Sequence, residues 1–97
     1  MKPTPNSLDG ARVIYYTPID HQHRFTGGTR QIVAGKLMGA MAGLAICQYP
    51  DEDAFYLFGC DADWSTVTDT WHPSIEEAKA QAAFEYEGVS LTWQMVT

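Results

Sequence analysis

The chain has 97 residues, of which 45% are hydrophobic and 12% are aromatic, and its formal net charge is −6. This composition is typical of one folded domain that spans residues 1–97, and it excludes an intrinsically disordered protein. The acidic balance argues against a nucleic-acid partner, because such binding needs a basic surface that displaces counterions from phosphates. It also argues against binding to an anionic membrane surface.

Two features of the sequence indicate a cytoplasmic protein. Residues 1–7 lack the apolar core of a signal peptide, and the apolar run Leu37–Cys47 is too short to span a bilayer. The cysteines, Cys47 and Cys60, are too few for a disulfide scaffold. We therefore expect both to be buried free thiols in a reducing compartment.

The N-terminal half of the chain predicts few regular elements. Residues 1–10 contain two prolines, and we expect a flexible tail there. A strand is predicted over Arg12–Thr17 and ends at Pro18, after which a polar loop leads to a candidate short strand, Arg30–Val33. The segment Gly35–Gly43 is open between an irregular connection and a helix, although its three glycines disfavour an isolated helix.

A β-hairpin is predicted in the middle of the chain. The apolar runs Leu44–Tyr49 and Phe55–Cys60 flank a polar loop, residues 50–54. If Tyr49 faces Phe55, Cys47 and Cys60 lie on opposite faces of the sheet, which would exclude a disulfide between them. Both faces of the hairpin are then apolar, so both need a cover.

The C-terminal third predicts two strands on either side of a helix. A third strand over Ser65–Trp71 has Val67 and Trp71 on one side and threonines on the other, which is a half-buried pattern. A fourth strand is predicted over Val89–Val96, where apolar and polar residues alternate.

The best-defined element is a helix from about Ser74 to Glu87. Ser74 and Glu77 have capping-box spacing, and Gly88 is the predicted stop. One narrow, alanine-rich stripe can lie close to a sheet: Ile75, Ala78, Ala82 and Tyr86. Together the elements predict an α+β fold, in which an antiparallel sheet of about four or five strands carries this C-terminal helix on one face.

The histidine-containing segment Asp20–His23 is the best candidate for a metal site. On a strand, His21 and His23 would point the same way, and Asp20 or His72 could complete the set of ligands. A spacing of two residues is a weak signal, however, and the segment is predicted to be a loop. Surface histidines are the simpler interpretation, so we predict neither a bound metal nor a cofactor.

Catalysis is not predicted. Asp69, His72 and Ser74 resemble the members of a hydrolytic triad, but the chain has no Gly-x-Ser-x-Gly elbow, and Ser74 already serves as a helix cap. Cys60 and His72 could form a nucleophile pair, but an apolar strand is a costly place for a thiolate.

Self-association is predicted from the two apolar faces of the hairpin. The single helix covers one face, and an exposed second face would exceed the apolar area that monomers tolerate. A homodimer would bury that face in both copies. The interface candidates on the sheet are Leu44, Ile46, Tyr56 and Phe58. Phe84, on the outer face of the helix, is a further candidate for contact with a second subunit or a protein partner. In the alternative, Leu37, Met38 and Met41 fold over the face and complete a monomer.

Part of the chain resembles small bacterial proteins of unknown function. The resemblance lies in the C-terminal half, in the segments Phe55–Phe58, Thr68–His72, Glu76–Ala78, Gln81–Ala82 and Phe84–Tyr86. It implies no activity and no catalytic residues. At the level of the fold alone, a hairpin followed by a strand and a helix also resembles small antitoxin-like modules.

These observations predict a small, non-catalytic protein-interaction or regulatory module that self-associates. One alternative is an acidic inhibitor or immunity-type protein that masks a basic site on its partner. Another is an accessory protein that binds a metal or a small ligand.

Overall fold

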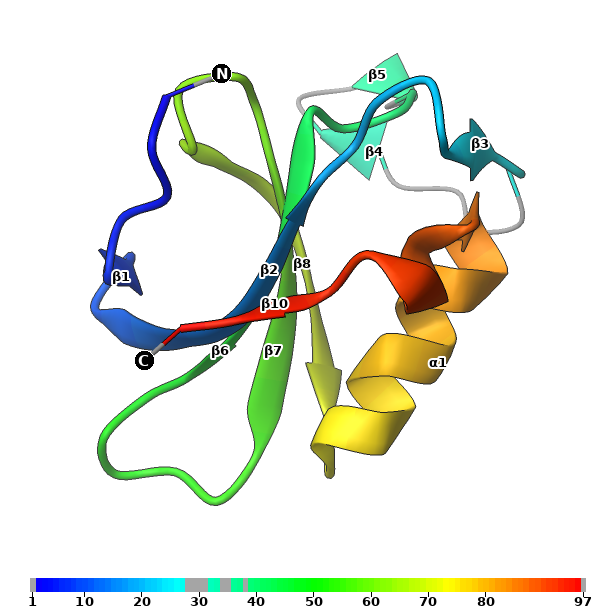
Figure 1. The fold of residues 1–97 in the computed structure, drawn as a ribbon. Coiled ribbons are helices and arrows are strands. Elements are labelled where there is room, and N and C mark those ends of the chain that lie inside the picture. Colours follow the sequence, from blue (N-terminus) through cyan, green and yellow to red (C-terminus); the bar gives the residue numbers. More distant parts are fainter. Residues whose placement is uncertain (1, 28–31, 34–35, 38, 97) are drawn as a thin grey trace.

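The computed structural model describes residues 2–27, 32–33, 36–37 and 39–96, and it confirms the α+β fold (Figure 1). One helix packs against an antiparallel, curled sheet. In chain order the elements are β1 (Ser7–Leu8), β2 (Ala11–Pro18), β3 (Arg24–Phe25), β4 (Ile32–Val33), β5 (Lys36–Leu37), β6 (Gly43–Gln48), β7 (Phe55–Cys60), β8 (Thr66–His72), α1 (Ile75–Glu85), β9 (Tyr86–Glu87), the 3₁₀ turn η1 (Val89–Leu91) and β10 (Gln94–Met95).

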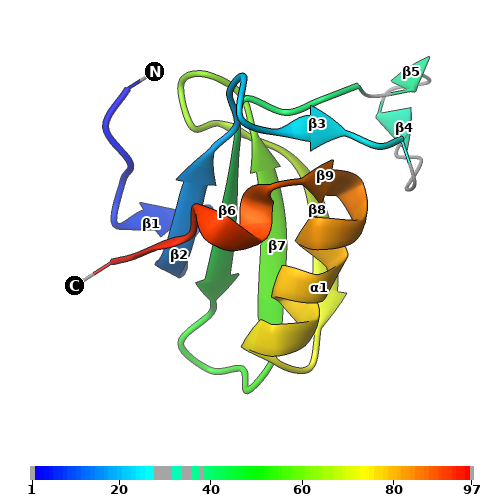
Figure 2. The ribbon, with the colours of Figure 1, turned by 45° about the vertical axis from the view of Figure 1, so that its right-hand side comes forward.

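The sheet has an apolar cluster on each of its faces. Its strand order is β1-β2-β6-β7-β8, and β10 also pairs with β2 (Figure 2). Helix α1 covers one face, where Ala78 and Ala82 lie against Leu44, Ile46 and Leu57. On the other face, the first two strands and one tryptophan enclose a second cluster, which comprises Leu8, Ala11, Val13, Ala45, Cys47, Phe58, Cys60 and Trp64.

The pairing of β6 with β7 differs by one residue from the predicted register. Ile46 lies opposite Leu57, and Cys47 lies opposite Tyr56. A shift of one residue moves side chains to the other face of a sheet, so Cys47 and Cys60 share one face and one cluster. Both are free and buried. Tyr56 and Cys60 are separated by four residues, which is about 13 Å along a strand, so separation along the strand rather than opposite faces keeps the thiols apart.

This register also removes the exposed apolar face on which the homodimer was predicted. Leu44 and Ile46 are buried beneath α1, whereas Phe58 is buried on the opposite face. Met41 is half-buried on the helix side, where its N–H donates to the Tyr86 hydroxyl at 2.8 Å. The side chains of Leu37 and Met38 lie outside the described residues. Of the sheet candidates, Tyr56 alone is partly exposed.

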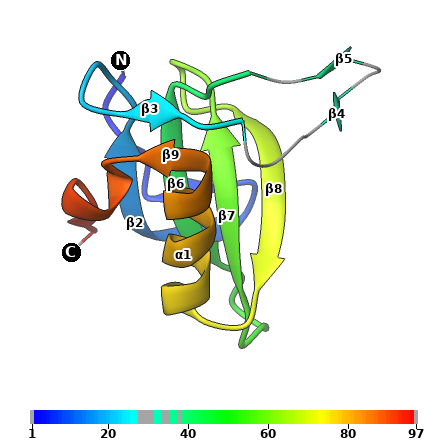
Figure 3. The same cartoon turned by 90° about the vertical axis from the view of Figure 1, so that its right-hand side faces the viewer.

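The helix begins as predicted and ends earlier. The hydroxyl of Ser74 accepts the N–H of Glu77 at 3.1 Å, which makes Ser74 the N-cap. The helix ends at Glu85, because Tyr86 is extended and joins β9, which pairs with β3 (Figure 3). Gly88 has a φ of 90° but begins η1, so it does not cap α1 as predicted.

The N-terminal segment is more ordered than the predicted tail. Asp9 and Gly10 have φ values of 49° and 85° and form a two-residue turn between β1 and β2. Such turns require positive φ at both positions, and Asp-Gly is a preferred pair for them. The turn folds Leu8 into the core, where it is 6% exposed.

The last strand forms only in part. Val89–Leu91 is a 3₁₀ turn with Val89 fully buried, and only Gln94–Met95 pairs with β2. A register shift near Ile14 divides β2 into two parts. The first part pairs with β1 and the second with β10, so the outer edge of β2 is occupied by segments from both ends of the chain.

The glycine-rich connection lies partly outside the described residues, so the prediction for Gly35–Gly43 is tested only in part. Within the described part, Ile32–Val33 and Lys36–Leu37 pair as a small antiparallel sheet, and Gly43 begins β6. In the part of the chain that the structure describes, no helix has both the length and the apolar character needed to cross a membrane.

The helix cap gives a first prediction. Ser74→Ala removes the acceptor of the Glu77 N–H, and we expect the free energy of unfolding to fall by about 1 kcal/mol. Ser90→Ala is the matched control, because Ser90 is exposed within η1, whose N-cap is Gly88. Urea denaturation measures both variants. Equal midpoints for wild type and Ser74→Ala would contradict the capping role.

Candidate functional site

The segment Asp20–His23 forms a tight turn, which separates the two predicted metal ligands. The N–H of His23 donates to the Asp20 carbonyl at 3.0 Å, and the N–H of Gln22 donates to the Asp20 carboxylate at 2.9 Å. The side chain of His23 is 1% exposed, whereas His21 is exposed. Among the described residues no three side chains of histidine, cysteine, aspartate or glutamate gather as metal ligands would.

His23 belongs to a buried network that resembles a catalytic triad in its distances. Its Nε2 lies 2.8 Å from Oγ1 of Thr92, and its Nδ1 lies 3.3 Å from a carboxylate oxygen of Asp20. The backbone N–H of Asp20 lies 3.1 Å from the same Nδ1 and can only donate. We therefore assign the proton of the imidazole to Nε2, which donates to Thr92.

In this tautomer the hydrogen bond between His23 and Thr92 runs in the opposite direction to the one that activates a nucleophile. A general base must accept the proton of the hydroxyl, whereas His23 donates to Thr92. The Thr92 hydroxyl in turn lies 2.7 Å from that of Thr17, which is fully buried and reaches the carbonyl of Pro18 at 3.1 Å. The network thus joins the turn after β2 to the segment after η1, and its role is structural.

The other candidates for catalysis are also engaged elsewhere. Ser74 caps α1, and Nε2 of His72 lies 2.7 Å from Oγ1 of Thr70. Burial raises the pKa of the Cys60 thiol to about 12, and nearby Asp61 adds to the shift. Burial likewise raises the pKa of Cys47 to about 12. A thiol with such a pKa carries almost no thiolate at neutral pH, so neither cysteine is a nucleophile.

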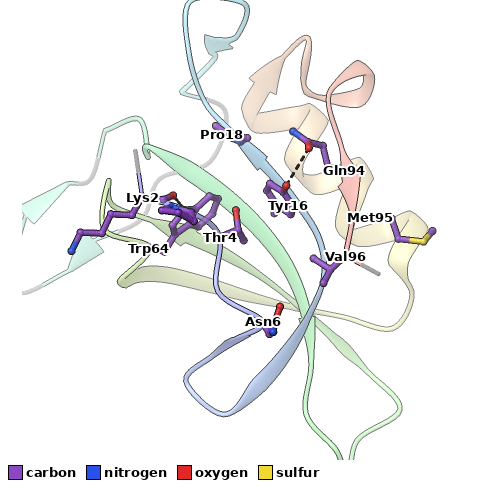
Figure 4. Close-up of a pocket in the computed structure, with 10 residues that line it drawn as sticks. Lys2, Thr4, Asn6, Tyr16, Pro18, Trp64, Gln94, Met95 and Val96 are labelled. Atoms are coloured by element: carbon purple, nitrogen blue, oxygen red, sulfur yellow. Dashed lines mark hydrogen bonds between the residues drawn. The ribbon is translucent and has the colours of Figure 1, made fainter.

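A groove of about 550 Å³ lies between the two ends of the chain (Figure 4). Residues 2–4 and Asn6 line one side and residues 94–96 the other, with Tyr16 between them and its hydroxyl donating to Gln94 at 3.1 Å. Trp64 closes one end, and its Nε1 donates to the Lys2 carbonyl at 2.8 Å. The described lining holds no carboxylate, histidine or thiol, so the groove offers contacts to a polar molecule but no reactive group.

Trp64 reaches this position through an unusual backbone conformation. Its φ is 62°, in the left-handed region that disfavours a bulky residue. The carboxylate of Asp61 accepts the N–H groups of Asp63 and Ser65, both at 2.9 Å, and so holds the turn. The side chain of Trp64 is 3% exposed, and its ring meets that of Tyr16 edge-on at 6.0 Å. Burial of the indole compensates the strained turn.

Trp71 is the residue that most clearly departs from its predicted place. The sequence pattern indicated that the Val67 and Trp71 side of β8 was buried, but Trp71 is 58% exposed, and Thr68 on the helix side is buried. Trp71 lies opposite Tyr56 in the register, so both point away from α1. Because β8 is the edge strand and β1 covers only the far end of this face, nothing in the described chain encloses the indole.

Tyr56, which lies opposite Trp71 on β7, contacts a further aromatic ring and a carboxylate. The ring of Tyr56 packs edge-on against Tyr49 at 5.3 Å, and its hydroxyl donates to Glu52 at 3.1 Å. Asp69 lies two residues before Trp71 on the same side of the strand and is exposed. We call the outer edge of β8, together with Asp69, Trp71, Tyr56 and Glu52, the β8 surface.

The β8 surface carries uncompensated negative charge. No lysine or arginine of the described residues forms an ion pair with Asp69 or Glu52. This negative charge affects the nearby tyrosines. The hydrogen bond to Glu52, and after it desolvation, raises the pKa of Tyr56 above its ordinary value. The pKa of Tyr49 is raised by desolvation first and then by Asp9, Asp69 and Glu52.

The two edges of the sheet differ. The outer edge of β2 is paired with β1 and β10, whereas no described strand pairs with the outer edge of β8. Figure 3 shows β8 at the open side of the sheet, beyond β7. An unpaired edge strand presents free N–H and C=O groups to solvent. The open backbone edge, the exposed indole and the uncompensated carboxylates therefore coincide on one surface.

Comparison with protein-family models, with curated proteins and with solved structures finds no match for this chain. The resemblance to small bacterial proteins of unknown function thus stays a prediction, and we infer the function from the site.

Sequence reasoning missed the β8 surface because the half-buried pattern of Ser65–Trp71 indicated that the apolar side, with Val67 and Trp71, was the buried one. The sequence of β8 could not show which of its two faces was covered, because both faces hold residues that are common in strands. One signal was available: Asp69 in the middle of the strand is unusual in a fully paired sheet and typical of an edge.

His72, at the end of β8, gives a prediction about pH. Desolvation lowers its pKa below the ordinary value of 6.5, an effect that Glu77 partly opposes. The unfolded chain therefore binds the proton at a higher pH than the folded chain, so stability is full above about pH 6.5 and falls as the pH drops below it. Urea unfolding between about pH 5 and pH 7.5 measures this slope.

The matched variants are His72→Gln and His21→Gln. We expect His72→Gln to flatten the dependence in this window, and His21→Gln to leave it unchanged, because His21 is exposed. Identical slopes for wild type and His72→Gln would show that His72 titrates alike in both states.

Proposed function

We propose that this protein is a non-catalytic protein-interaction module that binds a basic protein partner through the β8 surface. The observation that carries the proposal is Trp71, whose large aromatic side chain is 58% exposed on an edge strand. Tryptophan is enriched among the residues that dominate binding at the centres of interfaces. The uncompensated carboxylates of Asp69 and Glu52 set the sign of the partner, since a positive surface complements them.

The state of the potentially reactive groups supports a binding role over an enzymatic one. The Ser74 hydroxyl is occupied as a cap, the tautomer assigned to His23 donates to Thr92, and burial raises the pKa of both thiols to about 12. The unpaired thiols also support a reducing compartment such as the cytoplasm.

An acidic inhibitor or immunity-type protein is the more specific form of the same proposal. Such a protein covers a basic active site of its partner, and the net charge of −6 and the β8 surface suit that task. An accessory role in binding a metal or small ligand has less support, because the turn at Asp20 points His21 and His23 apart.

Affinity capture from an extract of the source organism tests the proposal. We expect wild-type protein to retain a specific basic partner and Trp71→Thr to lose it, because the variant keeps a strand-forming residue but removes the indole. Leu91→Thr is the control, since Leu91 is 88% exposed but belongs to η1, on the far side of α1 from β8 in Figure 3. Equal capture by all three proteins would contradict the β8 surface as the binding site.

Self-association also remains a proposal, and Phe84 is the predicted interface residue best placed to support it. Phe84 is 58% exposed on the outer face of α1. Light scattering at micromolar concentration compares wild type with Phe84→Ser. A dimer mass for wild type that falls to a monomer mass for the variant supports an interface on α1. A monomer mass for both proteins contradicts self-association.

A further inference from the structure

We propose that the β8 surface receives its partner by strand addition: an extended, basic segment of another protein pairs with the open edge of β8. This inference rests on the proposed function and adds the mode of binding and the chemistry of the partner. Three features of the described residues carry it: the length of the free edge, the position of Asp69, and the side on which Trp71 lies.

The edge is long enough to hold a strand. β8 has seven residues, Thr66–His72, and its inner edge pairs with β7 along almost its whole length. In antiparallel pairing, alternate residues direct their N–H and C=O groups to one neighbour, so those of the remaining residues point outward. Seven residues match the usual length of a strand, and an added strand would satisfy the free groups.

Asp69 decides against a second copy of this chain as the added strand. It is the central residue of β8, so an antiparallel pairing of two complete β8 strands about a two-fold axis would place Asp69 opposite its own copy. Like charges directly opposite each other are destabilising, and each chain has a net charge of −6. A lysine or arginine opposite Asp69 turns the same position into a favourable cross-strand pair.

Trp71 defines a second basic position in the partner. It lies on the same side of β8 as Asp69, two residues further along, and Tyr56 lies beside it on β7. A guanidinium or ammonium group over an indole face gains a cation–π interaction, and arginine stacks best. On the opposite, helix-facing side of β8, Thr68 is buried and Thr70 is half-buried, so β-branched residues of the partner would extend this less exposed side of the sheet. The expected segment thus alternates basic and β-branched residues.

Selection of binding peptides tests this inference while the partner is still unidentified. Peptides that bind immobilised wild-type protein are selected from a displayed library of random sequences. The peptides are about seven residues long, which matches the length of the β8 edge. We expect the selected peptides to alternate lysine or arginine with valine, isoleucine or threonine. Their affinity for Asp69→Lys should fall about tenfold, and Trp71→Thr should weaken them as well, whereas Leu91→Thr should bind as wild type does.

Two further measurements identify strand addition. A proline placed at the centre of a selected peptide removes an N–H donor and should abolish binding. Amide hydrogen exchange should show new protection along Thr66–His72 when the unmodified peptide binds. Asp69→Asn removes the central charge, so it should weaken binding of basic peptides and raise the tendency of the free protein to form dimers, as seen by light scattering.

The outcomes separate this inference from the proposed function. Peptides that need Trp71 but show no basic pattern, or that tolerate proline, would overturn strand addition by a basic segment and leave the β8 surface as a binding site. Peptides that bind all variants equally, or a failure to select any peptide, would overturn both. Selection of acidic peptides would contradict the assigned charge of the partner.

Discussion

The structure depends on covering both faces of the β6–β7 hairpin. Nearly every residue of these strands is apolar, so neither face can stay in water. Helix α1 covers one face because its alanines allow close approach to Leu44, Ile46 and Leu57. The other face is covered by β1, β2 and Trp64. The cover formed by α1 needs only a local helix signal. The cover on the other face requires β1 and β2 to meet Trp64, which is distant from them in sequence.

That second cover explains two unusual features of the backbone. Asp9 and Gly10 adopt positive φ so that β1 can turn back along β2 and bring Leu8 into the core. Trp64 accepts a left-handed conformation so that its indole can enter the same cluster. Burial of a large apolar side chain contributes about 2–3 kcal/mol, which exceeds the roughly 1–2 kcal/mol that a left-handed backbone costs.

The same arrangement leaves the sheet asymmetric. Segments from both ends of the chain pair with β2 at one edge, whereas no described strand pairs with the outer edge of β8 at the other. In the proposed binding mode, the central carboxylate of Asp69 disfavours pairing between two copies, as charged residues do in other edge strands. Next to it, the indole of Trp71 is exposed, and in the proposed binding mode it contacts the partner. An edge that repels its own copy and attracts positive charge is suited to selective association.

The sequence by itself determined the elements whose signals are local. The capping pair Ser74 and Glu77 set the start of α1, the stripe of Ala78 and Ala82 set its buried face, and two apolar runs set the hairpin strands. The α+β class followed from these elements. The dipeptide Asp9–Gly10 is also a local signal, because it is typical of tight hairpin turns. The sequence analysis nevertheless predicted a flexible tail there.

Tertiary structure decided everything that depends on which segment covers which face. The register of β6 against β7 rests on a shift of one residue, which hydrophobicity cannot settle when both faces are apolar. That shift placed Cys47 with Cys60 and buried Leu44, Ile46 and Phe58 within the chain. Whether Trp71 was core or surface depended on which segments cover the sheet face that lies away from α1. Such coverage arises from contacts between distant segments, and no local pattern of residues encodes it.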